Sequence, residues 1–156
     1  MNVKCWLIIL ALASFIVSTA NAISDSDKTS LGMAGESVLT SMPEILYADV
    51  SFGWDDSMDI WIVPTVIATG GSQEEISEDL IKIIAGAMGV YVGTYHEYND
   101  VGQMGLTIGA DKTKSIGTAY CLPEWAAEVR YNGYTPNEDD LGNLGLKILG
   151  TLKVSS

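Results

Sequence analysis

The chain has 156 residues, of which 8 are basic and 20 acidic, so its formal net charge is −12. Such a charge repels nucleic-acid phosphates and anionic membrane surfaces, and no Lys/Arg cluster counters it locally, so we expect neither as a partner. The acidity favours solubility, cations and basic partners.

Residues 1–22 have the pattern of a cleavable signal peptide. Lys4 gives a basic start, residues 6–17 are apolar except for one serine, and Ala20 and Ala22 are small residues where signal peptidase reads the chain. An uncleaved anchor is the alternative, but a spanning helix needs roughly 20 apolar residues, more than this run supplies. We expect cleavage after Ala22, a secreted or extracytoplasmic location, and no membrane attachment afterwards.

Cleavage would leave a single small, acidic domain. The removed segment holds one lysine and no acidic residue, so the remaining 134 residues carry a net charge of −13. Residues 23–30 are rich in Ser and Asp without apolar periodicity, which predicts a disordered leader. Residues 31–156 then form one α+β domain, since this length suits a single core.

The domain begins with a predicted weak helix and a strand. Residues 31–39 place apolar side chains at roughly helical spacing, although Gly32 and Gly35 lower the helix propensity. Residues 48–54 alternate between apolar and polar, which is typical of a half-buried strand, and the alternation places Trp54 on the buried face.

A polar connection, residues 55–58, precedes a second predicted strand over residues 59–69, with Pro64 at an edge or a bulge. The two strands form a hairpin. Ser72 and Glu75 then make a capping box, and acidic residues follow in the next turns, where the N-terminal end of a helix favours negative charge. A helix is therefore predicted to begin here.

One apolar stripe extends this helix to about Tyr95. Its glycines are spaced by three and four residues, so we expect them to line one face and to allow close approach of a neighbour: Gly86, Gly89 and Gly93. Residues 88–98 remain open to a second interpretation, because Val90-Tyr91-Val92 also suits a strand. We favour the long helix.

The C-terminal part predicts a second hairpin and two helices. Residues 101–109 and 115–122 are strands joined by a polar loop. A short helix begins at Pro123, and residues 137–152 form an amphipathic helix capped by Asn137. The expected fold is α+β: a four-stranded antiparallel sheet from two hairpins, with the long central helix and the C-terminal helices packed on one face.

Cys121 and His96 are the catalytic candidates. Cys5 would leave with the signal peptide, so Cys121 would be the only cysteine and could form no intrachain disulfide. A thiol hydrolase needs a stabilised thiolate with a base nearby, but the surroundings of Cys121 are apolar and carry no such signature. We therefore expect a buried, unreactive thiol, and no catalytic residue is assigned.

Asp55, Ser57 and Asp59 fall at the first, third and fifth positions of a calcium loop. The pattern then fails, because Ile60 stands where a glycine is required and Val66 where a glutamate is required. A loosely held cation is one interpretation of this loop, and a solvated turn is the one we favour. We expect no cofactor.

Aromatic residues late in the chain suggest a binding surface, and Tyr131 and Tyr134 flank the turn that we expect to be most exposed. With an export signal, a competent core and no reactive cluster, the sequence favours a non-enzymatic module that binds another protein or forms a homodimer. The alternatives are a small thiol hydrolase using Cys121 and His96, and an acidic cation-binding accessory protein.

Overall fold

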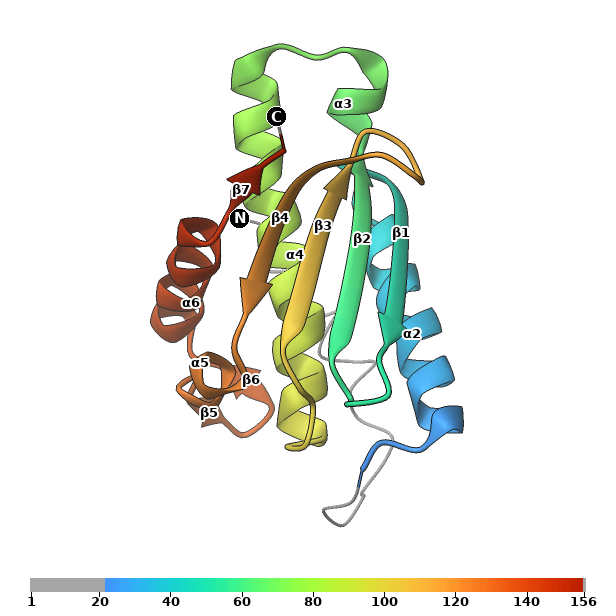
Figure 1. Ribbon diagram of the computed structural model, residues 1–156. Coiled ribbons are helices and arrows are strands. Elements are labelled where there is room, and N and C mark those ends of the chain that lie inside the picture. The colour runs from blue at the N-terminus through green and yellow to red at the C-terminus, as the bar shows by residue number, and fades with distance from the viewer. Residues whose placement is uncertain (1–21, 156) are drawn as a thin grey trace.

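The computed structural model describes residues 22–155, so most of the predicted signal peptide, residues 1–22, and Cys5 lie outside the described residues (Figure 1). The α+β class is confirmed. The elements are α2 (Asp25–Thr40), β1 (Ile45–Phe52), β2 (Met58–Pro64), α3 (Thr65–Thr69), α4 (Gln73–Glu97), β3 (Met104–Gly109), β4 (Ser115–Cys121), α5 (Pro123–Ala127), β5 (Tyr131–Asn132), β6 (Thr135–Pro136), α6 (Glu138–Gly150) and β7 (Lys153–Val154).

The main sheet has five strands in the order β1-β2-β3-β4-β7, with β2 and β3 parallel. The predicted four-stranded antiparallel sheet is therefore wrong. Both hairpins exist, but α4 carries the chain back to the end of the sheet where β2 begins, so Met104 pairs with Met58 and the strands run the same way. A fifth strand, β7, pairs with β4.

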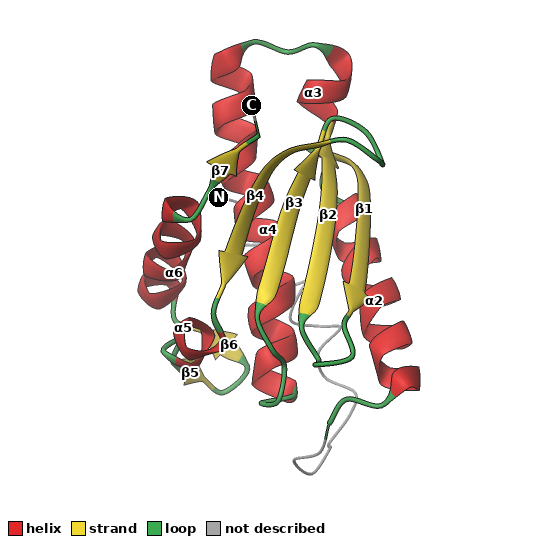
Figure 2. Cartoon of the chain, in the orientation of Figure 1, coloured by secondary structure: helices red, strands yellow, loops and turns green. Residues whose placement is uncertain are grey.

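Helices α2, α4 and α6 lie on one face of this sheet, and no helix of residues 22–155 covers the other face, called the open face below (Figure 2). Side chains alternate accordingly: Ile60, Ile62 and Leu106 are buried, whereas Asp59 and Thr118 on the open face are exposed. No helix within residues 22–155 has the length and apolar character needed to cross a membrane.

The predicted disordered leader, residues 23–30, is wrong. Ile23 is only 4% exposed and belongs to the core, and Ser24 caps α2 by accepting a hydrogen bond of 3.2 Å from the backbone N–H of Asp27. The helix predicted over residues 31–39 thus begins at Asp25. A polar contact of Lys28, described below, also holds this segment to the domain.

Gly32 allows α2 to pack closely against β1. A Cβ atom on Gly32 would lie 2.6 Å from the carbonyl oxygen of Val50. Glu36, one turn further along, accepts a hydrogen bond of 3.2 Å from the backbone N–H of Val50. Helix α2 therefore covers part of an otherwise open strand edge, which protects it from pairing with another chain.

The strand predicted over residues 59–69 is only partly correct. Strand β2 ends at Pro64, and the last five residues form the short helix α3. Pro64 lacks an N–H for further pairing and is the N-cap of α3. Gly70, with φ of 75°, ends α3 in a left-handed conformation that suits glycine.

Helix α4 runs to Glu97, so residues 88–97 are helical and the strand alternative is wrong. The capping box is confirmed: Glu75 N–H donates to Ser72 Oγ, and Ser72 N–H donates to Glu75 Oε2 at 2.8 Å. The predicted glycine face is only partly correct. A Cβ on Gly86 would meet Met42 at 2.7 Å, whereas one on Gly93 would meet nothing within 4 Å.

The C-terminal segment closes the far edge of the sheet. Asn137 caps α6, as predicted, by accepting a hydrogen bond of 3.0 Å from Asp140 N–H. Beyond α6, the Thr151 hydroxyl accepts a hydrogen bond of 2.9 Å from Tyr120 N–H, and Ser155 N–H donates to the carbonyl oxygen of Ile116. These contacts satisfy backbone groups at the outer edge of β4.

Candidate binding site at the tip of the first hairpin

Trp54 lies at the tip of the β1–β2 hairpin and is 95% exposed. The alternation of apolar and polar residues predicts Trp54 on the buried face of a strand, which is wrong because β1 ends at Phe52. A usable signal was present in the sequence: Gly53 before Trp54 and Asp55-Asp56 after it are turn-forming residues. An exposed tryptophan presents a large apolar surface to water, which is unfavourable unless a partner covers it.

The loop that carries Trp54 has a well-defined internal structure. Gly53 N–H donates to the carbonyl oxygen of Ser57 at 2.8 Å. Asp55 Oδ1 accepts hydrogen bonds from the Ser57 hydroxyl at 2.6 Å and from its backbone N–H at 3.2 Å. These bonds hold the pKa of Asp55 below its usual range. Asp56 completes the turn with a left-handed φ of 60°.

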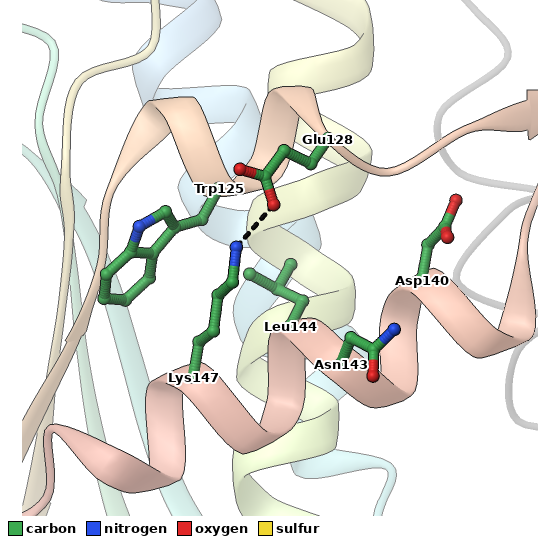
Figure 3. Close-up of a pocket in the computed structure, with 6 residues that line it drawn as sticks. All are labelled: Trp125, Glu128, Asp140, Asn143, Leu144 and Lys147. Atoms are coloured by element: carbon green, nitrogen blue, oxygen red, sulfur yellow. Dashed lines mark hydrogen bonds and ion pairs between the residues drawn. The ribbon is translucent and has the colours of Figure 1, made fainter.

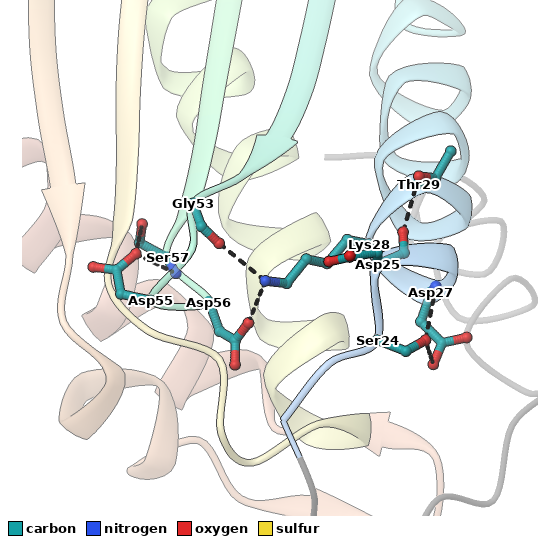
Figure 4. A network of polar contacts seen from close by, with 9 residues as sticks. All are labelled: Ser24, Asp25, Asp27, Lys28, Thr29, Gly53, Asp55, Asp56 and Ser57. Atoms are coloured by element: carbon teal, nitrogen blue, oxygen red, sulfur yellow. Dashed lines mark hydrogen bonds and ion pairs between the residues drawn. The ribbon is translucent and has the colours of Figure 1, made fainter.

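Lys28 of α2 fixes this loop from one side (Figure 4). Its Nζ donates to the carbonyl oxygen of Gly53 at 3.0 Å and forms an ion pair with Asp56 Oδ1 at 2.6 Å. The side chains of Lys28 and Asp56 are only 16% and 14% exposed, so this pair is screened by water less than a surface pair would be.

The α4–β3 connection holds the loop from another side. Gly102 N–H donates to the carbonyl oxygen of Asp56 at 2.9 Å. A Cβ on Gly102 would lie 3.0 Å from the backbone nitrogen of Ser57, so the two segments are in close contact. The hairpin tip is therefore tied to two other elements, and Trp54 projects from a preorganised base.

The three residues of the predicted calcium loop are only partly brought together. Asp55 and Ser57 bond to each other, whereas Asp59 lies on β2 on the open face of the sheet. Across residues 22–155 no three His, Cys, Asp or Glu side chains are grouped so as to hold a metal ion. The cation that this loop does contact is the ammonium group of Lys28.

Cys121 is free and buried, with its Sγ 3.6 Å from the carbonyl oxygen of Leu122. Burial raises the pKa of the Cys121 thiol to about 12. His96 is exposed, and its ring stacks on Tyr131 with the ring centroids 3.8 Å apart. No hydrogen bond of the described chain joins Cys121 to His96.

The two tyrosines predicted as binding residues have different surroundings. Tyr134, at the β5–β6 turn, is 79% exposed. Tyr131 is half-buried, its hydroxyl donates to the carbonyl oxygen of Val92 at 3.4 Å, and burial raises its pKa to about 12. Tyr134 is thus available to a partner, whereas Tyr131 supports His96 and packs against α4.

A shallow pocket of about 110 Å³ lies between α5 and α6 (Figure 3). Both of its carboxylates already have a basic partner: Lys147 pairs with Glu128, and Arg130 binds Asp140 through two hydrogen bonds of 2.8 and 2.9 Å. The charges are thus neutralised internally, which leaves little to attract a charged ligand. The lining residues are Trp125, Glu128, Asp140, Asn143, Leu144 and Lys147.

The lowered pKa of Asp140 predicts that the free energy of unfolding depends on pH in the acid range. Hydrogen bonds from the side chain and backbone N–H of Arg130 lower its pKa to about 2, against about 3.9 in an unfolded chain. A depressed folded-state pKa stabilises the fold above pH 4, and the contribution is lost as the pH falls towards 2. We expect Asp140→Asn to flatten the stability profile between pH 4 and pH 2 in urea unfolding. Asp139→Asn is the control, and an unchanged profile in Asp140→Asn would contradict the assignment.

Comparisons of the chain with protein-family models, with curated proteins and with solved structures gave no significant match. Function is therefore inferred from the geometry of residues 22–155. Within them, the hairpin tip is the place where a large apolar side chain is fully exposed on a structured base.

Proposed function

We propose that the chain is exported and that its mature domain is a non-enzymatic module that binds another protein through Trp54. The observation that carries this proposal is the 95% exposure of Trp54 on a loop fixed by Lys28 and Gly102. Tryptophan is enriched among the residues that dominate protein interfaces. A rigid base also reduces the conformational entropy lost on binding.

The start of the folded domain supports the export part of the proposal. Ala22 is exposed, whereas Ile23 is buried and Ser24 caps α2. Cleavage after Ala22 would therefore leave every core residue of the described part of the chain in the mature protein. Cleavage a single residue later would remove Ile23, whose buried side chain contributes to the core.

Site-specific photo-crosslinking in the source cells tests the binding function. A photoreactive p-benzoylphenylalanine replaces Trp54 in the exported protein, and the same group replaces Leu46 in a control. Leu46 is a matched position because it is apolar, 60% exposed and at the other end of β1.

We expect a specific crosslinked product from position 54 that position 46 does not give. A product with one other protein supports a binding module, and a product with a second copy of the chain supports a self-associating module. If position 54 gives the same products as position 46, Trp54 is not an interface residue. Amino-terminal sequencing of the same material is expected to begin at Ile23.

A further inference from the structure

We infer that the partner is a protein whose basic side chains surround an apolar pocket, and that it docks end-on so that this pocket receives Trp54. The inference rests on the proposed function and names the chemistry of the partner. The surface that it contacts is called the acidic end here, and it comprises residues 22–28, 53–57 and 97–103.

The three segments of the acidic end form one surface, although they are far apart in the sequence. Lys28 joins the first segment to the second through Gly53 and Asp56. Gly102 joins the third segment to the second through the carbonyl oxygen of Asp56. The start of α2, the tip of the first hairpin and the α4–β3 connection accordingly lie at the same end of the molecule (Figure 1).

The acidic end, on which the exposed Trp54 lies, carries a strong negative charge. The three segments contain six carboxylates and one lysine, a formal charge of −5, and the lysine is already paired with Asp56. Cleavage before Ile23 would add one α-ammonium group and leave −4. The carboxylates are Asp25, Asp27, Asp55, Asp56, Glu97 and Asp100.

The pKa values of two side chains of the acidic end, Asp55 and Tyr98, are shifted by their surroundings. The hydrogen bonds from Ser57 lower the pKa of Asp55, so the carboxylate next to Trp54 keeps its charge in mild acid. Burial raises the pKa of the Tyr98 phenol, and the carboxylates of Asp27 and Glu97 raise it further. Their negative potential therefore extends to this buried side chain.

Charge complementarity favours a basic protein over the other possible occupants. A second copy of the mature domain would carry the same net charge of −13 and the same acidic end, so the two would repel. An anionic membrane repels this end for the same reason. Basic side chains around the tryptophan pocket would instead be attracted before contact and would pair with the carboxylates on docking.

A selection with a defined probe tests the chemistry of the partner. The exported protein is immobilised and panned with a phage-displayed library of random dodecapeptides, and peptides that also bind Trp54→Ala are removed. Peptides that depend on Trp54 are synthesised, and their affinities are measured at about 50 and 300 mM NaCl, a range in which screening of exposed charges increases strongly. Asp55→Asn/Asp100→Asn is the charge variant, and Asp49→Asn on the open face of the sheet is its control.

We expect the selected peptides to combine an apolar residue with two or more Lys or Arg. Their affinity should fall at least tenfold over this salt range and several-fold in the double Asp variant, with no change in Asp49→Asn. Neutral or acidic Trp54-dependent peptides, or binding unaffected by salt, would overturn the basic partner and leave the proposed function standing. Failure to find any Trp54-dependent peptide would count against both. A dimer in sedimentation that Trp54→Ala abolishes would assign the site to a second copy.

Discussion

Gly32→Ala is expected to lower the free energy of unfolding by about 2 kcal/mol, because over-packing a well-packed contact typically costs this much. The new methyl group would lie 2.6 Å from the carbonyl oxygen of Val50. That oxygen belongs to the backbone of β1 and cannot rotate away, so α2 must move. The shift would also weaken the hydrogen bond between Glu36 and Val50 N–H.

Gly93→Ala in α4 is the matched control, because its Cβ would meet nothing within 4 Å. Alanine is favoured over glycine inside a helix by roughly 0.5–1 kcal/mol, so this variant should be more stable than the wild type. Urea unfolding followed by circular dichroism measures both variants. If Gly32→Ala is as stable as Gly93→Ala, α2 does not pack against β1 at this distance.

Cys121 is expected to react with iodoacetamide about a thousandfold more slowly in the folded protein than an ordinary exposed cysteine does at pH 8. Only the thiolate is alkylated, and a pKa of about 12 leaves a very small thiolate fraction at this pH, whereas a free cysteine has a pKa of about 8.5. Burial of the sulfur slows access further.

The same measurement in urea is the control, since the unfolded chain should react at the ordinary rate. Fast alkylation of the folded protein would favour the thiol hydrolase alternative, in which Cys121 must be an accessible thiolate. Slow alkylation agrees with a structural role of Cys121 in the core at the end of β4.

The elements whose signals are local could be predicted from the sequence. The capping box of Ser72 and Glu75 gives the start of α4 correctly, and Asn137 gives the start of α6. The alternation of apolar residues finds β3 and β4, although β3 begins at Met104 and not at residue 101. In each case, neighbouring residues alone determine the conformation.

The features that depend on distant residues could not be predicted. The parallel pairing of β2 with β3 depends on where α4 returns the chain, and a hairpin pattern in the sequence does not contain this information. The helical start of α2 depends in part on Lys28, whose partners Gly53 and Asp56 are 25 or more residues away. Local composition in residues 23–30 therefore indicated disorder where tertiary contacts impose a helix.

The candidate site was predicted only in part. The acidic turn at residues 55–58 was recognised, but as a solvated turn or a loose cation site, and Trp54 was assigned to the core. Alternation of side chains continues through Trp54, so the pattern alone does not show where the strand ends. The contacts of Lys28 and Gly102 with the hairpin loop, which hold Trp54 on a fixed base, also join segments that are far apart in the sequence.

The dissociation constant of the protein crosslinked at position 54, measured for the wild type and for Trp54→Ala, tests the central role of Trp54 most directly. We predict binding at least about thirtyfold weaker in Trp54→Ala, because truncation of a dominant interface residue costs about 2 kcal/mol or more. The thermal unfolding midpoint should not change, since a side chain that is 95% exposed contributes little to the fold. Equal affinity in the two proteins would contradict the account.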